Sequence, residues 1–203
     1  MTLRVPSADA VAQLISQREG VDSAVAALAA REAQSHIGMA TRLATDDQAR
    51  LRRDESVGLV LGLTTVSSAV KAAADLLDIA KADAAALVER HDASEREELL
   101  HSLGIAPGGA VPQALRSQLK TLEEDQKRRS TRSLRDAVDR ILVDVMSVLR
   151  DVVMLQVEAG VELVNEAHRS AISARAQATT AELTLSALDA LAVARKRMAG
   201  NSP

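Results

Sequence analysis

A run of arginines near the middle of the chain is the feature best suited to chemistry. Residues 127–135 read KRRSTRSLR, with five basic residues and no acid. Guanidinium groups bind carboxylates and phosphates through paired hydrogen bonds. The arginines of this run are therefore candidate partner-binding residues: Arg128, Arg129, Arg132 and Arg135.

Three acids precede this basic run and leave its interpretation open. Glu123, Glu124 and Asp125 each stand four residues ahead of a base, which is the favourable order for ion pairs within a helix. The default interpretation is a solvated helix face held by such pairs. The alternatives are contact with an acidic surface of a protein partner and contact with DNA phosphates.

Other residue types that carry catalysis or bind cofactors form no recognisable site. The chain has no Cys, which excludes thiol catalysis and disulfides. His91 and His101 flank three glutamates, but their spacing matches no helical metal motif, and His36 and His168 lie far away. No serine stands in a nucleophile elbow, and no glycine-rich phosphate loop is present. We predict no enzyme activity, no cofactor and no metal.

The composition predicts an all-α fold. The chain has 203 residues, of which 47% are hydrophobic, but it contains no Phe, Trp or Tyr. Alanine and leucine favour helices, whereas sheets favour aromatic and β-branched residues. The lack of aromatic rings also excludes single-stranded nucleic-acid binding by base stacking.

Charge and hydropathy limit where in the cell the protein is expected. The formal net charge of -3 predicts no chain-wide attraction to nucleic acid or membrane. No apolar run approaches the roughly 20 residues that span a bilayer. Residues 1–12 lack the pattern of a secretory leader, so we predict a cytoplasmic protein.

The first part of the chain predicts a small bundle of three short helices, followed by a longer helix. Apolar spacing indicates helices over 8–18, 24–34 and 37–44, with Ser7 capping the first and Gly20 ending it. Asp22 or Ser23 caps the second. The motif TDDQ at 45–48 is a capping box with Thr45 as the cap, and it opens a helix that runs to about residue 61.

The second part predicts long helices. One covers 65–103, and we expect its apolar stripe to include Val66 and Val70. A Pro- and Gly-rich loop at 106–112 precedes a helix over 115–158, which would be about 65–70 Å long if unbroken. A second capping box at 179–182 opens the last helix. The expected inward residues of that helix are Leu183, Leu185, Leu188 and Leu191.

Several segments together carry a family resemblance. They are RVPSADAV at 4–11 with REGVD at 18–22, AQSHIGMATRLATD at 33–46, RSTRSLRDAVDRILVD at 129–144, and LRDVV at 149–153 with AGVELV at 159–164. In order and spacing they resemble the C-terminal two-thirds of the delta prime subunit of the bacterial DNA polymerase III clamp loader, in its actinobacterial form. The resemblance covers almost the whole chain, although no single segment is diagnostic.

The resemblance implies an architecture and a role. Residues 1–52 would be the three-helix lid of a AAA+ protein, and 53–203 the helical collar through which clamp-loader subunits assemble. The family's nucleotide-binding-like domain would precede Thr2, and relatives continue past 201–203. In ATP-hydrolysing relatives the third lid helix carries a nucleotide-sensing arginine, and this chain has Gly38 there. Relatives also place aromatics around 147–149, where this chain has none.

The implied function is non-catalytic assembly of the clamp loader for DNA replication. The implied partners are the motor (gamma/tau-type) and delta subunits, with DNA contact indirect at most and no membrane. Collar contacts are expected from the last helix, through Leu185, Leu188 and Leu191. The alternative is a stand-alone helical-bundle adaptor that self-associates.

Overall fold

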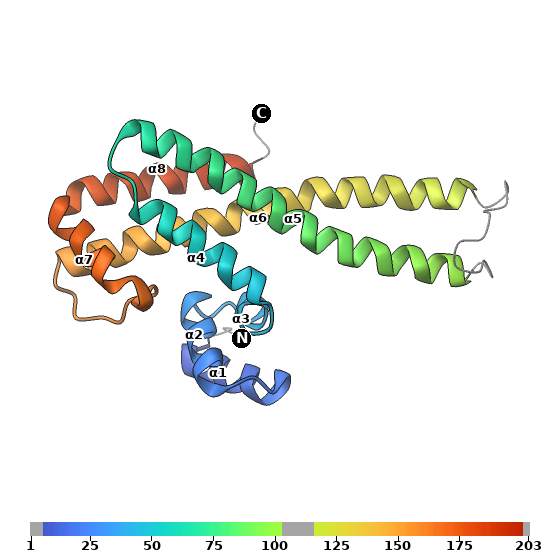
Figure 1. The fold of residues 1–203 in the computed structure, drawn as a ribbon, viewed down its shortest axis with the longest axis horizontal. Coiled ribbons are helices and arrows are strands. Elements are labelled where there is room, and N and C mark those ends of the chain that lie inside the picture. Colours follow the sequence, from blue (N-terminus) through green and yellow to red (C-terminus); the bar gives the residue numbers. More distant parts are fainter. Residues whose placement is uncertain (1–5, 103–115, 201–203) are drawn as a thin grey trace. The chain divides into compact units, whose positions relative to one another are not determined.

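The computed structural model describes residues 6–102 and 116–200. These residues form helices α1 to α8 and one 3₁₀ turn, η2, and no strand occurs among them, as Figure 1 shows. The all-α prediction is therefore confirmed for this part of the chain. The predicted 106–112 loop lies outside the described residues.

The chain divides into two compact units. Unit 1 combines the residues up to Ala72 with those from Leu142 onward, and unit 2 consists of Ala73–Ile141. Because α5 and α6 are continuous helices, each contributes residues to both units. The boundary that the resemblance implies near residue 52 falls inside a single helix, α4, and stays a prediction.

Three short helices of unit 1 form a bundle. They are α1 (Ala8–Glu19), α2 (Ser23–Glu32) and α3 (Ile37–Thr45), close to the predicted spans. Their shared core is rich in alanine, which lets the helix backbones approach closely. The largest buried members of this core are Val11, Ile15 and Leu43.

The ends of these helices follow local rules. Ser7 caps α1 through a 3.2 Å hydrogen bond from the Ala10 amide, and Gly20 ends it with a φ of 67°. The Asp22 carboxylate caps α2. That helix ends two residues earlier than predicted, because Gln34 and Ser35 both take positive φ values and the Ser35 amide donates to the Ala30 carbonyl.

The next helix, α4 (Asp47–Leu61), begins one residue away from the predicted cap. The Asp46 side chain accepts from the Ala49 amide at 3.1 Å and acts as the cap. Thr45, the predicted cap, instead belongs to α3, where its hydroxyl donates to the Thr41 carbonyl at 2.9 Å. The capping-box prediction therefore had the right position for the helix but the wrong capping residue.

Helices α5 (Val66–Ser102) and α6 (Arg116–Gln156) are the longest. In unit 2 their segments run side by side in opposite directions (Figure 1). Their buried residues there are mostly small or aliphatic, and they are Ile79, Ala80 and Ala84 on α5 and Ala137 and Ile141 on α6.

At the start of α5, the predicted apolar stripe is exposed rather than buried. Val66 is 83% exposed and Val70 is 68% exposed, whereas the nearby Ala72 is buried. A helix turns about 100° per residue, so the face that holds Ala72 and Ile79 points away from the face that holds Val66 and Val70. The side that packs is the one that holds Ala72 and Ile79.

The segment after α6 contains elements that the periodicity did not predict. After Gly160, which has a φ of 65°, come η2 (Glu166–His168) and α7 (Arg169–Ala178). Ile172 of α7 is buried against Val152 of α6 and Leu163 of the connecting loop. This cluster holds α7 against α6 within unit 1.

The last helix, α8 (Ala181–Ala199), is capped by Thr180, whose hydroxyl accepts from the Leu183 amide at 3.4 Å. Its inward face was predicted correctly only in part. Leu183 and Leu185 are exposed, Thr184 is buried, and Leu188 and Leu191 are half-buried. Positions 184, 188 and 191 share a helix face, and Leu183 and Leu185 lie on either side of it.

A first prediction concerns the three-helix bundle. Replacing buried Ile15 with Ala should lower the free energy of unfolding by about 2–5 kcal/mol, because it removes apolar contacts and leaves a cavity. Replacing the neighbouring Leu14, which is 43% exposed, should cost less than about 1 kcal/mol. Urea unfolding of both variants measures the difference, and equal losses would contradict the described core.

Candidate functional site

The four candidate arginines on α6 divide into two kinds. Arg129 is half-buried and turns toward α5, where it bonds both carboxylate oxygens of Glu95 and lies 3.6 Å from the Asp92 carboxylate. The hydrogen bond with Glu95 raises the pKa of Arg129. Arg129 therefore holds α5 and α6 together inside unit 2 and is not available to a partner.

The other three arginines face outward. Arg128, Arg132 and Arg135 are exposed and follow one another at helix positions i, i+4 and i+7. Arg128 has only long contacts, 4.0 Å to Glu124 and 3.8 Å to Asp125 of its own helix. These three residues, hereafter the arginine stripe, form one line along α6.

Two further contacts show how the two helices of unit 2 are joined. Arg140 on α6 reaches Asp83 on α5 at 3.1 Å, and both side chains are partly buried. Gln126 on α6 donates to the Asp92 carbonyl at 3.3 Å. Together with Arg129, these bonds place basic and amide groups of α6 against acceptors of α5.

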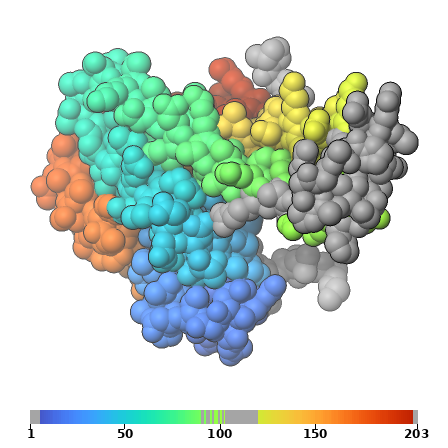
Figure 2. Space-filling view, turned by 45° about the vertical axis from the view of Figure 1, so that its right-hand side comes forward, coloured from blue at the N-terminus to red at the C-terminus, as the bar shows by residue number. Residues whose placement is uncertain are grey.

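The three candidate leucines of α8 do not form one surface. Leu185 is 48% exposed and lies beside the helix face that holds the half-buried Leu188 and Leu191. The outward side of α8 carries other apolar residues, Leu183 at 64% and Val193 at 48% exposed. Unit 1 also exposes Val66 and Val70, and Figure 2 shows the first turns of α5 at the surface.

A buried polar cluster in unit 1 was not predicted. Arg53 of α4 is only 6% exposed, and three acceptors surround it. Its guanidinium lies 3.1 Å from Glu32 of α2 and 3.2 Å from Asp144 of α6, and it donates to the Asn165 side chain at 2.7 Å. One side chain thus joins three helices and the loop before α7.

Asn165 is itself held by a second buried acid. Asp151 of α6 is fully buried, and its carboxylate accepts from the Val164 and Asn165 amides at 3.0 and 2.8 Å. The Asn165 side-chain amide donates to Asp151 at 2.9 Å and to the Ser147 hydroxyl at 3.0 Å. These bonds fix the end of the loop at Val164 and Asn165.

The surroundings of Glu32 in this cluster explain the shift in its pKa. Burial raises the pKa of the Glu32 carboxyl above its ordinary value of 4.5, and the attraction of Arg53 only partly offsets this effect. No sequence pattern marks the cluster, because its members come from positions 32, 53, 144, 151 and 165. The only sequence signal for the cluster would have been charged residues at helix positions that the apolar spacing assigns to the core.

The remaining candidates for chemistry have structural roles. The His36 ring accepts from the Met39 amide at 3.2 Å and caps α3, and His168 lies 2.7 Å from Asp54. The side chains of His91 and His101 lie outside the described residues. Among the described residues, no group of three or more His, Asp or Glu is arranged to hold a metal ion.

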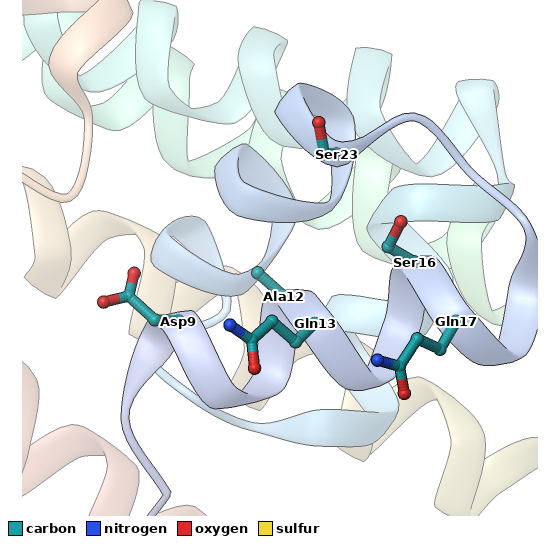
Figure 3. A pocket seen from close by; sticks show the side chains of 6 residues that line it. All are labelled: Asp9, Ala12, Gln13, Ser16, Gln17 and Ser23. Atoms are coloured by element: carbon teal, nitrogen blue, oxygen red, sulfur yellow. The ribbon is translucent and has the colours of Figure 1, made fainter.

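One open hollow lies beside α1. Figure 3 shows Gln13 and Gln17 projecting from the same side of α1. The only ionisable residue that lines the hollow is Asp9, whose carboxylate is exposed. The lining residues are Asp9, Ala12, Gln13, Ser16, Gln17 and Ser23.

No family model, curated protein or solved structure matches this chain. In the part of the chain that the structure describes, none of the helices is long and apolar enough to cross a membrane.

A second prediction concerns Arg53. Replacement with Met keeps the apolar stem but leaves Glu32 and Asp144 without their buried cation, so the free energy of unfolding should fall by about 3–5 kcal/mol. The control is Arg18→Met, whose side chain is 75% exposed, with a change within about 0.5 kcal/mol. Urea unfolding near pH 7 compares them, and a loss at Arg53 no larger than the control would refute the role.

A third prediction follows from the raised pKa of Glu32. Above pH 4.5 the folded state binds more protons at Glu32 than the unfolded state does, so this group's contribution to stability is lost as pH rises through its folded pKa. Glu32→Gln removes that titration. The stability of the variant relative to the natural chain should therefore increase with pH above 4.5, measured by urea unfolding at a series of pH values. A constant difference would contradict the assignment.

Proposed function

We propose that this chain is the lid and collar portion of a delta prime subunit of the bacterial DNA polymerase III clamp loader. In this proposal it catalyses nothing and binds the motor and delta subunits of the complex through its helix faces. Residues 1–52 would serve as the lid and 53–203 as the collar. Its contribution to DNA replication would be to help hold together the machine that loads the sliding clamp.

The observation that carries an assembly role is the exposure of large apolar side chains on two helices of unit 1. Val66 and Val70 on α5 and Leu183 and Val193 on α8 are 48–83% exposed. Single exposed apolar residues are ordinary, but repeated ones along a helix face favour a protein partner. This exposure supports assembly through helix faces, and Leu188 and Leu191 would then support α8 from its inner side.

The assignment to the clamp loader depends on the resemblance of the sequence segments. The first two cover parts of α1 and all of α3 in the three-helix bundle, and a bundle of that size is consistent with a lid. The third and fourth segments contribute Asp144 and Asp151, which are both part of the buried polar cluster. The segments that carry the resemblance thus also supply interactions on which the fold depends.

Gly38 supports a role without ATP hydrolysis. A glycine there has no side chain that could reach a phosphate, whereas the ATP-hydrolysing relatives have an arginine. Packing does not demand glycine at this position, since an added Cβ would meet the His36 ring at an ordinary 3.6 Å. Crowding at the Cβ position therefore does not account for the glycine, and its presence suits a subunit that leaves hydrolysis to its neighbours.

A fourth prediction tests this function by reconstitution. Mixed with purified motor and delta subunits, the chain should elute as part of a complex in size-exclusion chromatography with light scattering. Leu183→Asp/Val193→Asp should weaken that complex at least about tenfold, because charges would enter an apolar contact. The matched control, Ser170→Asp/Gln177→Asp at exposed positions of α7, should assemble like the natural chain.

Two results would contradict the proposal. The first is the absence of any complex with the motor and delta subunits. The second is a tight, closed homo-oligomer of the chain alone, lost in the Leu183→Asp/Val193→Asp variant, which would favour the self-associating adaptor. Circular dichroism of each variant checks that its helices are intact.

A further inference from the structure

The arginine stripe is a second exposed surface, separate from the apolar residues of unit 1. Arg128, Arg132 and Arg135 extend over about 10 Å of α6 at 1.5 Å per residue. Arg129, one position along, is tied to Glu95 and Asp92, so the neighbouring part of α6 is fixed against α5. The stripe is therefore presented on a supported helix rather than on a loop.

The guanidinium groups of the stripe form no close ion pair with acids among the described residues. Arg132 and Arg135 are exposed, and among the described residues neither has an ion-pair partner. Arg128 makes only the two long contacts to Glu124 and Asp125. Exposed pairs at such distances contribute little to stability, so all three guanidinium groups are free to bind a partner.

The distribution of charge around the stripe indicates the class of partner. The exposed charged residues from 123 to 136 comprise four acids and four bases, which are Glu123, Glu124, Asp125 and Asp136 against Lys127, Arg128, Arg132 and Arg135. A nucleic acid would meet the acids as well as the bases, because it carries a phosphate at every nucleotide. Two of these acids, Glu124 and Asp125, lie within about 60° of the stripe around the helix, so the surface that they share with it carries charges of both signs. Such a surface is complementary to a protein surface with the opposite order of charges.

We infer that the arginine stripe binds a carboxylate-bearing helix of another clamp-loader subunit, an inference that depends on the proposed function. Arginine forks hold carboxylates in paired hydrogen bonds, and three of them on one helix line match acids spaced at i, i+4 and i+7 on a facing helix. The acids at 123–125 lie at one end of the stripe, so a basic residue on the partner opposite them would set its direction.

The test compares charge reversal of the stripe with charge reversal elsewhere. The stripe variant is Arg128→Glu/Arg132→Glu/Arg135→Glu, and the control is Arg18→Glu/Lys81→Glu/Lys120→Glu, three exposed bases outside the stripe with the same change in net charge. The Kd of each full chain for the motor and delta subunits is measured by fluorescence titration at several salt concentrations. We expect the stripe variant to bind at least about tenfold more weakly with a reduced salt dependence, and the control to bind within about threefold of the natural chain.

Each outcome supports or overturns the inference. Equal weakening by both variants would mean that binding depends on net charge and not on the stripe. Unchanged binding by the stripe variant would mean that the stripe is not a binding surface. Loss of affinity for a 20-base-pair DNA duplex, with subunit binding intact, would assign the stripe to nucleic acid instead. If the natural chain forms no complex, the proposed function fails and this inference fails with it. Arg128→Gln/Arg132→Gln/Arg135→Gln, with helix content checked by circular dichroism, separates lost binding from lost folding.

Discussion

The buried Arg53 guanidinium is the interaction on which the arrangement of unit 1 most depends. Removing such a charge from water costs several kcal/mol, and this cost is recovered only with close partners. Glu32, Asp144 and Asn165 supply them from α2, α6 and the loop before α7. Displacing any of these elements would take an acceptor away from the buried guanidinium, so the cluster favours this arrangement of helices.

The same physical demand continues into the loop that precedes α7. Asp151 is fully buried and accepts from two backbone amides and the Asn165 side chain. Asn165 in turn accepts from Arg53. The loop is therefore defined by polar groups that satisfy one another, while Leu163 and Ile172 bury the apolar surface beside it.

The lack of aromatic residues shapes both the core and the surface. Alanines such as Ala26, Ala30 and Ala80 are completely buried, so helices approach closely but each contact buries little area. Larger aliphatic side chains remain outside, among them Val66 and Leu183. Unit 1 thus presents exposed apolar side chains and unit 2 presents the arginine stripe, so the two units differ in the chemistry of their surfaces.

The sequence alone determined the helices of the described residues except η2 and α7, and most of the helix ends. Ser7, Gly20 and Asp22 act through bonds to residues within four positions of them, so local patterns suffice to predict their roles. The tertiary structure decided which helix faces are buried and which charged side chains are paired within the molecule. Arg129 and Arg132 look alike in the sequence, yet one bonds α5 and the other faces solvent. Arg53 met its partners only on folding, because the acids that pair with it lie 21 and 91 positions away along the chain.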